Sequence, residues 1–302
     1  MTIRMLRTLV AIADTKTFSA AADVVHVTHA AVSQQMQVLE ADLGVTLFDR
    51  RTRTPELTPI AHQVVEKARK IIADYDNLVP SLHEKGELAS TIRLGVLRTT
   101  LTGLAPQAMA RLKAQHPKLG LHLKPGLTGT LLAELARGNL DAALVTRPSV
   151  MPQGVIFRTL VEEPMQLITA REEIGQDPIA LLKTKPFIRF NRTAVVGALI
   201  DNWILSKRIR VNEAMELDGL DAIASMVHAN LGVSIVPQLA VQPLDPLPVN
   251  QLSLGADAPC RILGLISPKA QTKVLAMDAL FNALDGVIAA SKSTGHTPAH
   301  DI

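Results

Sequence analysis

Residues 18–47 constrain this chain more than any other stretch, because their apolar spacing predicts two short helices joined by a tight turn. The first helix is expected at about residues 19–25, where the Ser19 hydroxyl can cap the first backbone N–H groups. After a connection at residues 26–27, Thr28 caps the second helix in the same way. The expected buried positions are Ala21, Ala22 and Val25 in the first helix and Ala31, Val32, Met36 and Leu39 in the second. The pattern is typical of a helix-turn-helix, although an amphipathic helix pair in a globular core would share it.

The opposite face of the second helix carries short polar side chains that suit the edges of DNA bases. Candidate DNA contacts in this segment are Thr28, His29, Ala30, Ser33, Gln34 and Gln37. A glutamine can pair bidentately with adenine in the major groove, and serine or histidine can contact bases or phosphates. The second helix is therefore the candidate recognition helix.

A basic hairpin is predicted directly after the recognition helix, which Gly44 ends. Residues 46–58 form two short extended runs around Arg50, Arg51 and Arg53, whose guanidinium groups would hold phosphates or enter a minor groove. Residues 1–58 carry six basic and six acidic side chains, and the whole chain has a formal net charge of +3. DNA affinity must therefore come from the placement of charge and from two copies acting together.

Residues 59–83 predict one long helix with an apolar seam that advances in steps of three and four residues. The seam consists of Ile60, Val64, Ala68, Ile71, Tyr75, Leu78 and Leu82. A helix of this length extends roughly 37 Å, which is too long for a small head domain to bury alone. It needs a partner, either a second copy of the chain or the chain's own second domain.

From residue 92 onward, strands alternate with helices, and the length suffices for two small α/β lobes. The expected strands are residues 92–97, 119–124, 141–145, 165–169, 186–190, 214–217, 232–236 and 262–267, and the expected helices are 101–115, 131–137, 197–207, 220–229 and 274–288. This order predicts a mainly parallel sheet with helices on both faces. Residues 161–164 and 262–267 would cross between the lobes.

Several strings resemble the LysR-type transcriptional regulators. They are residues 6–13, 17–22, 28–39, 43–50 and 57–58 in the first part and residues 138–143 and 226–233 in the second. The departures are His29, Ala30, Thr52 and residues 59–61. The resemblance implies an N-terminal winged helix-turn-helix domain (residues 1–58), a linker and dimerisation helix (59–88) and a two-lobed effector domain like the periplasmic binding proteins (89–302). Lobe I would hold residues 89–161 and 268–290, and lobe II residues 162–267.

A ligand pocket is predicted where the carboxyl ends of the strands meet helix N-termini. Candidate ligand contacts at these ends are Thr99, Thr100, Thr128, Thr146, Arg147 and Arg192. Hydroxyls, free amides and arginines suit a small anion, most simply a carboxylate. Each threonine could instead cap a helix, and each arginine could be a solvated surface charge.

An enzyme is not expected, because the nine histidines show no metal-ligand spacing and the chain has neither a glycine-rich phosphate loop nor a nucleophile elbow. No cofactor is expected either. Cys260, the single cysteine, is interpreted as a small buried apolar group, and low cysteine content agrees with the cytoplasm. The sequence shows no export signal and no run of 18 apolar residues, so no membrane partner is expected.

The sequence therefore predicts a cytoplasmic regulator that binds a small anionic effector and double-stranded operator DNA. It would act as a dimer that joins a second dimer in a tetramer, and RNA polymerase would be a further partner. The alternative is a solute-binding module whose N-terminal helices serve only for oligomerisation. That alternative predicts ligand binding without DNA binding.

Overall fold

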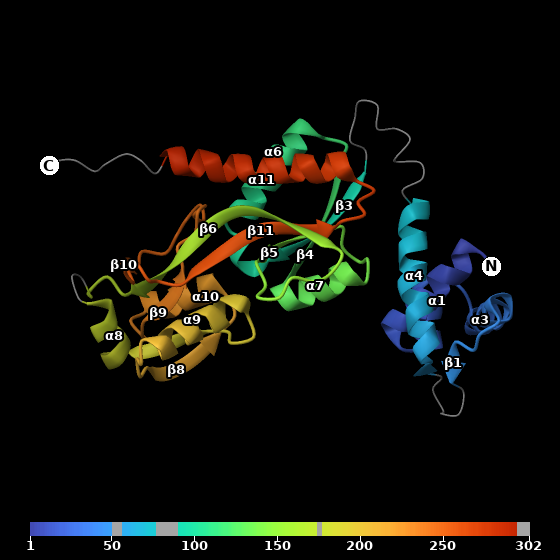
Figure 1. The fold of residues 1–302 in the computed structure, drawn as a ribbon, viewed down its shortest axis with the longest axis horizontal. Helices are drawn as coiled ribbons and strands as arrows, with labels where there is room; N and C mark the ends of the chain where they lie inside the picture. The colour runs from blue at the N-terminus through green and yellow to red at the C-terminus, as the bar shows by residue number, and fades with distance from the viewer. Residues whose placement is uncertain (50–55, 77–89, 174–176, 295–302) are drawn as a thin grey trace. The chain divides into compact units, whose positions relative to one another are not determined.

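The computed structural model of the chain describes residues 1–49, 56–76, 90–173 and 177–294 (Figure 1). The described elements belong to two compact units. The first unit holds the helices α1 to α4 with the short strands β1 and β2, and the second holds the elements from β3 to α11 except residues 136–139.

The first unit is a small helical domain closed by a two-stranded hairpin. Its elements are α1 (Ile3–Thr15), α2 (Phe18–Val24), α3 (His29–Leu43), β1 (Phe48–Asp49), β2 (Glu56–Leu57) and α4 (Pro59–Asp76). Leu9, Met36, Leu39 and Leu47 are fully buried at its centre. The predicted helix-turn-helix is confirmed at α2 and α3.

The cap of α2 differs from the sequence prediction, and that of α3 agrees with it. Thr17, not Ser19, begins α2, because its Oγ1 accepts a hydrogen bond from the Ala20 N–H at 3.1 Å. Thr28 caps α3 as predicted, accepting from the Ala31 N–H at 3.2 Å. Each helix begins at the threonine whose hydroxyl accepts a hydrogen bond from the backbone N–H three residues later. That N–H has no partner within the helix.

The second unit is built on one curled sheet in the order β10-β6-β11-β5-β3-β4, with β9 also paired to β6. The strands are β3 (Thr91–Leu97), β4 (Gly120–Gly126), β5 (Ala142–Thr146), β6 (Val155–Thr169), β9 (Ser234–Pro237), β10 (Asn250–Ser253) and β11 (Cys260–Pro268). Among the described strands of this sheet, β3 pairs in parallel with β4 and β5, whereas β6 and β11 run antiparallel to their neighbours. The expectation of a mainly parallel sheet is therefore wrong, because the returning strand β11 lies beside β5 and β6.

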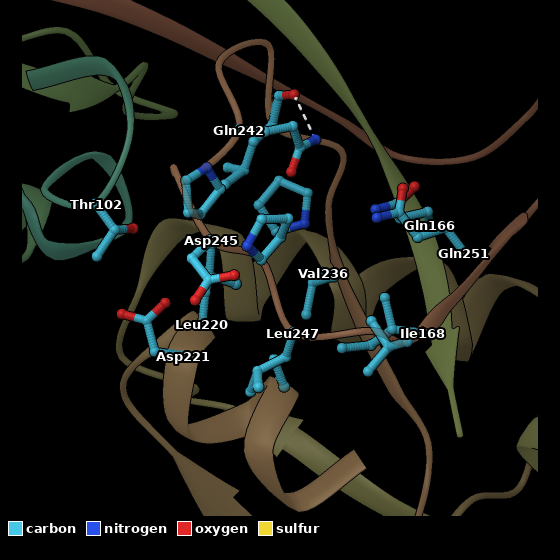
Figure 2. A pocket seen from close by; sticks show the side chains of 16 residues that line it. Thr102, Gln166, Ile168, Leu220, Asp221, Val236, Gln242, Asp245, Leu247 and Gln251 are labelled. Carbon is cyan, nitrogen blue, oxygen red and sulfur yellow. Dashed lines mark hydrogen bonds between the residues drawn. The ribbon is translucent and has the colours of Figure 1, made fainter. Parts of the chain in front are cut away.

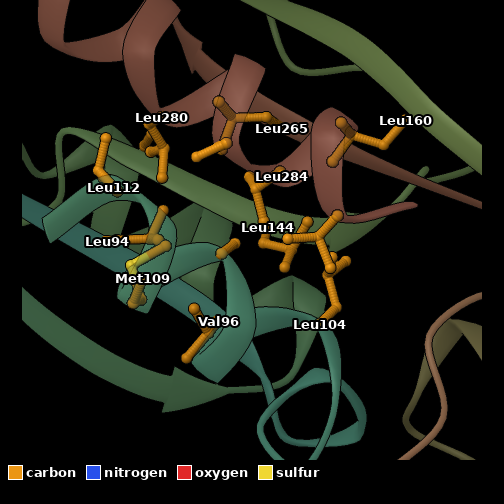
Figure 3. Packing of buried hydrophobic residues seen from close by; sticks show 14 of the residues in the cluster. Leu94, Val96, Leu104, Met109, Leu112, Leu144, Leu160, Leu265, Leu280 and Leu284 are labelled. Atoms are coloured by element: carbon orange, nitrogen blue, oxygen red, sulfur yellow. The ribbon is translucent and has the colours of Figure 1, made fainter. Parts of the chain in front are cut away.

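The first lobe packs helices on both faces of β3, β5 and β11. It contains the short 3-10 helix η1 (Arg98–Thr100), α6 (Leu104–Gln115), α7 (Thr128–Ala136) and α11 (Val274–Thr294). On one face, Leu112 of α6 and Leu280 and Leu284 of α11 enclose Leu94 and Leu144 of the sheet (Figure 3). The other face packs α7 against a separate apolar cluster. By length and composition alone α11 could cross a membrane, but its buried leucines make it a core helix here.

The second lobe has its own core. It contains α8 (Pro178–Thr184), β7 (Pro186–Phe190), α9 (Val195–Ser206), β8 (Asn212–Leu217) and α10 (Leu220–His228). Strands β7 and β8 pair in parallel, and a bridge between Phe187 and Val233 attaches β7 beside β9. Phe187 and Ile188 are fully buried at the centre of this lobe.

Two long strands join the lobes. Strand β6 runs unbroken for 15 residues, and β11 pairs with it from Cys260 opposite Pro164 to Pro268 opposite Val155. The predicted crossover at residues 161–164 is thus part of the continuous strand β6, and the lobes are joined by two strands as expected. One register shift interrupts the ladder between Leu263 and Gly264.

Candidate DNA interface and effector cleft

The turn between α2 and α3 holds the two helices at a fixed angle. His26 adopts a left-handed backbone with φ of 55°, and the Val27 N–H donates to the Ala22 carbonyl at 3.0 Å. A residue with a left-handed backbone ends α2 here. Glycine usually occupies such a position, but in this chain it is a histidine. A further bond from the Thr8 hydroxyl to Gln35 Oε1, 2.6 Å long, fastens α3 to α1.

The candidate DNA contacts lie along one open face of α3. Thr28, His29, Ala30, Gln34 and Gln37 are exposed, and Ser33 is half-buried. The inward face is occupied by the buried Val32, Met36 and Leu39. The His29 ring lies beside Phe18, with 6.1 Å between ring centroids, which orients this side chain at the start of the helix. The face is free to enter a groove.

The base of the hairpin is fastened to α3 by one carboxylate. Glu40 Oε1 accepts the N–H groups of Leu47 at 2.7 Å and of Phe48 at 3.1 Å. On the other side, the Thr58 hydroxyl donates to the Thr46 carbonyl at 2.9 Å and also caps α4. The predicted phosphate contacts Arg50, Arg51 and Arg53 lie outside the described residues.

Helix α4 has one face in the head and another in solvent. Ala61, Val65 and Ala68 are buried against the first unit, and the ion pair of Arg69 with Asp14 of α1 fastens the helix there. Ala68 was predicted in the exposed seam, but its helical angle places it with the head-facing residues.

Of the other described seam residues, Val64 is half-buried against the core of the head, and three are open to solvent. Ile60, Ile71 and Tyr75 are 43%, 47% and 52% exposed. Large apolar side chains in one row along a helix require a covering surface. The predicted positions Leu78 and Leu82 lie outside the described residues.

A small cleft of about 20 Å³ separates the two lobes of the second unit. Thr99, Thr128, Thr146 and Arg261 line its wall in the first lobe, and the apolar residues Phe190, Ala194, Val195 and Val196 line its wall in the second lobe. At the rim, Arg98 of η1 lies 4.0 Å from Asp218, which follows β8. This ion pair joins the two lobes across the cleft.

The Arg261 side chain is the charged centre of the cleft. It lies opposite Glu163 in the β6–β11 ladder, is 1% exposed, and donates from Nε to the Glu163 carboxylate. Its Nη1 donates to Thr99 Oγ1 at 3.0 Å. The other Glu163 oxygen accepts the Ala240 N–H at 2.8 Å, so the carboxylate is itself held in place.

Two hydrogen-bond donors in the cleft have no protein partner. Within the described part of the chain, neither Arg261 Nη2 nor Thr128 Oγ1 makes a hydrogen bond, although both atoms are buried. Thr128 is the first residue of α7, so backbone N–H groups of the first helical turn lie beside it. Unpaired donors, a guanidinium and a helix N-terminus together favour a bound anion.

The other predicted ligand contacts lie elsewhere. Thr100 is buried and donates to the Leu97 carbonyl at 2.8 Å. The guanidinium of Arg147 lies 5.8 Å from the centre of the Phe157 ring, and Arg192 pairs with Glu213 and Glu216 of β8. None of the three lines the cleft.

Sequence reasoning did not single out Arg261. The available signal was a lone arginine in the apolar strand at residues 260–268, matched by a glutamate in the other crossover segment. Recognising the pair requires the register of two strands that lie far apart in the chain.

Cys260 is exposed, so its interpretation as a buried apolar group is wrong. Alternation along β11 turns Arg261 inward and Cys260 outward. Desolvation, and then the nearby Glu162 carboxylate, raise the pKa of the thiol above its ordinary 9.0, so it is protonated at neutral pH. Among the described residues, no group of three histidine, cysteine, aspartate or glutamate side chains could hold a metal ion.

A helix-turn-helix head and a two-lobed domain with an anion-suited cleft together define a ligand-responsive DNA-binding regulator. Two family models, which together match most of the chain, support this class. The bacterial regulatory helix-turn-helix protein model of the lysR family matches residues 3–62, and the LysR substrate binding domain model matches residues 85–288. The chain belongs to the LysR family, whose members bind operator DNA and small-molecule effectors and self-associate.

Individual relatives support this assignment. The HTH-type transcriptional activator IlvY of Salmonella typhimurium is 27% identical over 250 residues, which cover 80% of this chain and 84% of IlvY. The probable RuBisCO transcriptional regulator of Synechocystis is 28% identical over 254 residues, covering 80% and 73% of the two chains.

Solved structures show the same fold. Full-length OxyR from Pseudomonas aeruginosa, a point variant, has a TM-score of 0.72 at 24% identity over 94% of both chains. Full-length CbnR in complex with its target DNA has a TM-score of 0.64 at 21% identity, covering 96% of this chain and 100% of CbnR.

Proposed function

We propose that this LysR-family regulator senses a small organic anion, most simply a carboxylate, in the cleft between its lobes. The observation that carries the proposal is the pair of buried, unpartnered donors, Arg261 Nη2 and Thr128 Oγ1. A carboxylate would accept from both and satisfy two groups that are costly to leave unpaired. The protein needs no enzymatic activity for this role and would act in the cytoplasm.

The shape of the cleft sets the size and character of the effector. Phe190, Ala194 and Val196 form an apolar wall opposite the donors, which suits a short hydrocarbon body attached to the carboxylate. A space of about 20 Å³ accommodates a group the size of one water molecule, so the lobes must separate to admit an organic acid. Separation would break the rim pair of Arg98 and Asp218. Effector binding is thereby coupled to the lobe arrangement.

The DNA-binding role rests on the exposed face of α3. We propose that Gln34 and Gln37 contact base edges, that Thr28, His29, Ala30 and Ser33 contact bases or the backbone near them, and that Arg50, Arg51 and Arg53 hold phosphates. The open row of Ile60, Ile71 and Tyr75 on α4 would be covered by the same helix of a second copy. Two heads could then bind a pseudo-palindromic operator, and two dimers would form a tetramer.

The effector proposal can be tested with a panel of small carboxylic acids and the uncharged amide of each. We expect at least one acid to raise the melting temperature of the full-length protein, and its amide to have little effect. At a concentration one hundred times Kd, the stabilisation would be about 2.7 kcal/mol. The same acid should change the mobility of the protein on DNA beside its own gene.

A control variant separates the cleft from general surface charge. Arg147→Gln removes an exposed charge that does not line the cleft, and it should leave the response to the acid unchanged. Equal stabilisation by an acid and its amide would refute the proposed anion site.

A further inference from the structure

The second lobe contains a cavity of about 280 Å³ that shares no lining residue with the effector cleft. Its floor is one face of β6, β9 and β10. Its walls are the first turns of α10 and the segment at residues 237–249, with Thr102 added from the first lobe (Figure 2). This volume lies near the lower end of the range found for small-molecule sites.

The register of the floor strands directs two glutamines to the same end of the cavity. Gln166 of β6 lies opposite Val236 of β9, and Gln251 of β10 lies opposite Ile168 of β6. Directly opposed residues share a face of the sheet, and Figure 2 shows both glutamines together. Gln166 is only 8% exposed. Its carboxamide makes no side-chain hydrogen bond to any residue that the structure describes, so its donors and its acceptor are available at the wall of the cavity.

The middle of the cavity is apolar. Ile168 and Val236 on the floor face Leu220 and Leu247 on the walls, and none of these side chains can form a hydrogen bond. Pro237, Pro243 and Pro246 also line the cavity. Their fixed φ angles restrict the covering segment, so the site is largely preformed.

The opposite end of the cavity is negatively charged. Asp221, in the first turn of α10, and Asp245, in the covering segment, lie there on the side away from the glutamines (Figure 2). No lysine or arginine is among the described lining residues, and neither carboxylate forms an ion pair with any part of the chain that the structure describes. The cavity therefore has a negatively charged end, an apolar middle and a far end with the glutamine amides.

We infer that this cavity binds a small organic cation with an apolar body and a polar far end. The ammonium group lies between Asp221 and Asp245. The hydrocarbon chain crosses Ile168 and Val236, and an amide or hydroxyl group reaches Gln166. The cation pairs with two exposed carboxylates that form no ion pair within the described residues, and its far end forms hydrogen bonds with the Gln166 carboxamide.

The cavity is connected to the effector cleft through its covering segment. Ala240 in that segment donates its N–H to Glu163, which holds Arg261 in the cleft. The segment also packs so closely on Gly103 of the first lobe that a Cβ there would lie 2.5 Å from the Val241 carbonyl oxygen. A cation that fixes this segment therefore changes the affinity of the cleft for its anion. This coupling rests on the proposed anion site, whereas binding of the cation does not.

The test uses 6-aminohexanamide as the probe, titrated into the full-length protein by calorimetry. Hexanamide, which lacks the amine, should bind at least tenfold more weakly. Asp221→Asn and Asp245→Asn should each weaken the probe by about tenfold, because each exchange removes one charge of the site. Asp285→Asn, an exposed exchange on α11 outside both sites, is the matched control.

Gln166→Leu tests the far end separately. It should remove the advantage of 6-aminohexanamide over hexylamine and leave hexylamine binding unchanged. The cation site is wrong if the probe does not bind, if hexanamide binds equally well, or if Asp285→Asn weakens the probe as much as Asp245→Asn. If the probe binds but does not shift the Kd of an acid found in the carboxylate panel, the coupling is refuted. If the probe binds and no carboxylate does, the proposed anion site fails and the cation site stands.

Discussion

Thr128→Val should make the ligand-free protein more stable and its effector binding weaker. The exchange keeps the shape of the side chain and removes a buried hydroxyl that has no hydrogen-bond partner within the described structure. An unsatisfied buried polar group costs about 1–3 kcal/mol, so we expect a gain near the lower end, about 1 kcal/mol. For a domain of this size, that corresponds to a rise in melting temperature of roughly 2–4 °C.

The same exchange removes a donor to the proposed carboxylate. A hydrogen bond to a charged group contributes about 1.5–3 kcal/mol, which corresponds to roughly ten- to hundredfold weaker binding. The assay is calorimetric titration of the full-length variant with an acid from the panel, beside a thermal unfolding curve without ligand. Thr130→Val, on the exposed side of the same helix, is the control and should change neither quantity.

The two effects have opposite signs, so the experiment separates a ligand contact from a structural one. If Thr128→Val lowered the melting temperature, the hydroxyl would be stabilising the fold, and its assignment as an unpaired donor would be wrong. If stability rose but affinity for the acid did not change, the acid would bind without this hydroxyl.

Three further predictions concern the head, the linker and the first lobe. Gln34→Ala should reduce the preference for operator over random DNA by about 1–3 kcal/mol, whereas Arg51→Ala should weaken binding to operator and random DNA alike and flatten the salt dependence. Mobility shifts at several salt concentrations measure both effects, and identical behaviour of the two variants would contradict the division of roles. Ile71→Glu should shift the protein toward monomer in sedimentation, because it places a charge in the open row of α4, and an unchanged mass would exclude that row from the interface. Burial alone would raise the pKa of Asp141, but hydrogen bonds from Arg93 and the charge of Lys273 hold this pKa below its ordinary 3.8. The stability that the Asp141 carboxylate contributes is therefore complete above pH 3.8 and is lost as the pH falls through the lower pKa of the folded protein. Asp141→Asn should therefore reduce the loss of stability on acidification below pH 3.8 in urea titrations, and an unaltered acid limb would show that other carboxylates dominate.

Local signals made the head and the individual strands predictable. Thr28 caps α3 and Gly44 ends it, and both are decided by residues within one helical turn. Strands β3 and β5 are short apolar runs with clear boundaries. In each of these cases the interacting groups lie close to one another along the chain.

Long-range pairing explains what the sequence did not predict. Glu162, Glu163 and Pro164 interrupt the apolar alternation of β6, so the strand was expected only from residue 165, whereas it runs unbroken from Val155. Its hydrogen-bond partner is β11, about one hundred residues later, and only that pairing places Arg261 against Glu163. The edge strand β10 and the short helix α8 were also missed.

The same distinction applies to the predicted ligand contacts. Thr99, Thr128 and Thr146 line the cleft because each follows or begins an element at the carboxyl edge of the sheet, as strand order predicts. Arg192 also follows a strand, but Glu213 and Glu216 on β8 pair with its guanidinium. The order of elements therefore located the cleft, and only the neighbours of each side chain decided its composition.

The β6–β11 ribbon has a mechanical consequence for a regulator of this kind. Within the described residues, the paired strands β6 and β11 connect the lobes, so a change in the angle between the lobes would bend or twist two hydrogen-bonded strands. The ladder is interrupted at one place, between Leu263 and Gly264, where Gly264 packs so tightly on Phe157 that a Cβ would lie 2.4 Å from the ring. Bending concentrates where the ladder is broken. If effector binding opens the cleft, the continuous ladder would resist bending everywhere except at this point and would favour return to the angle seen here once the effector leaves.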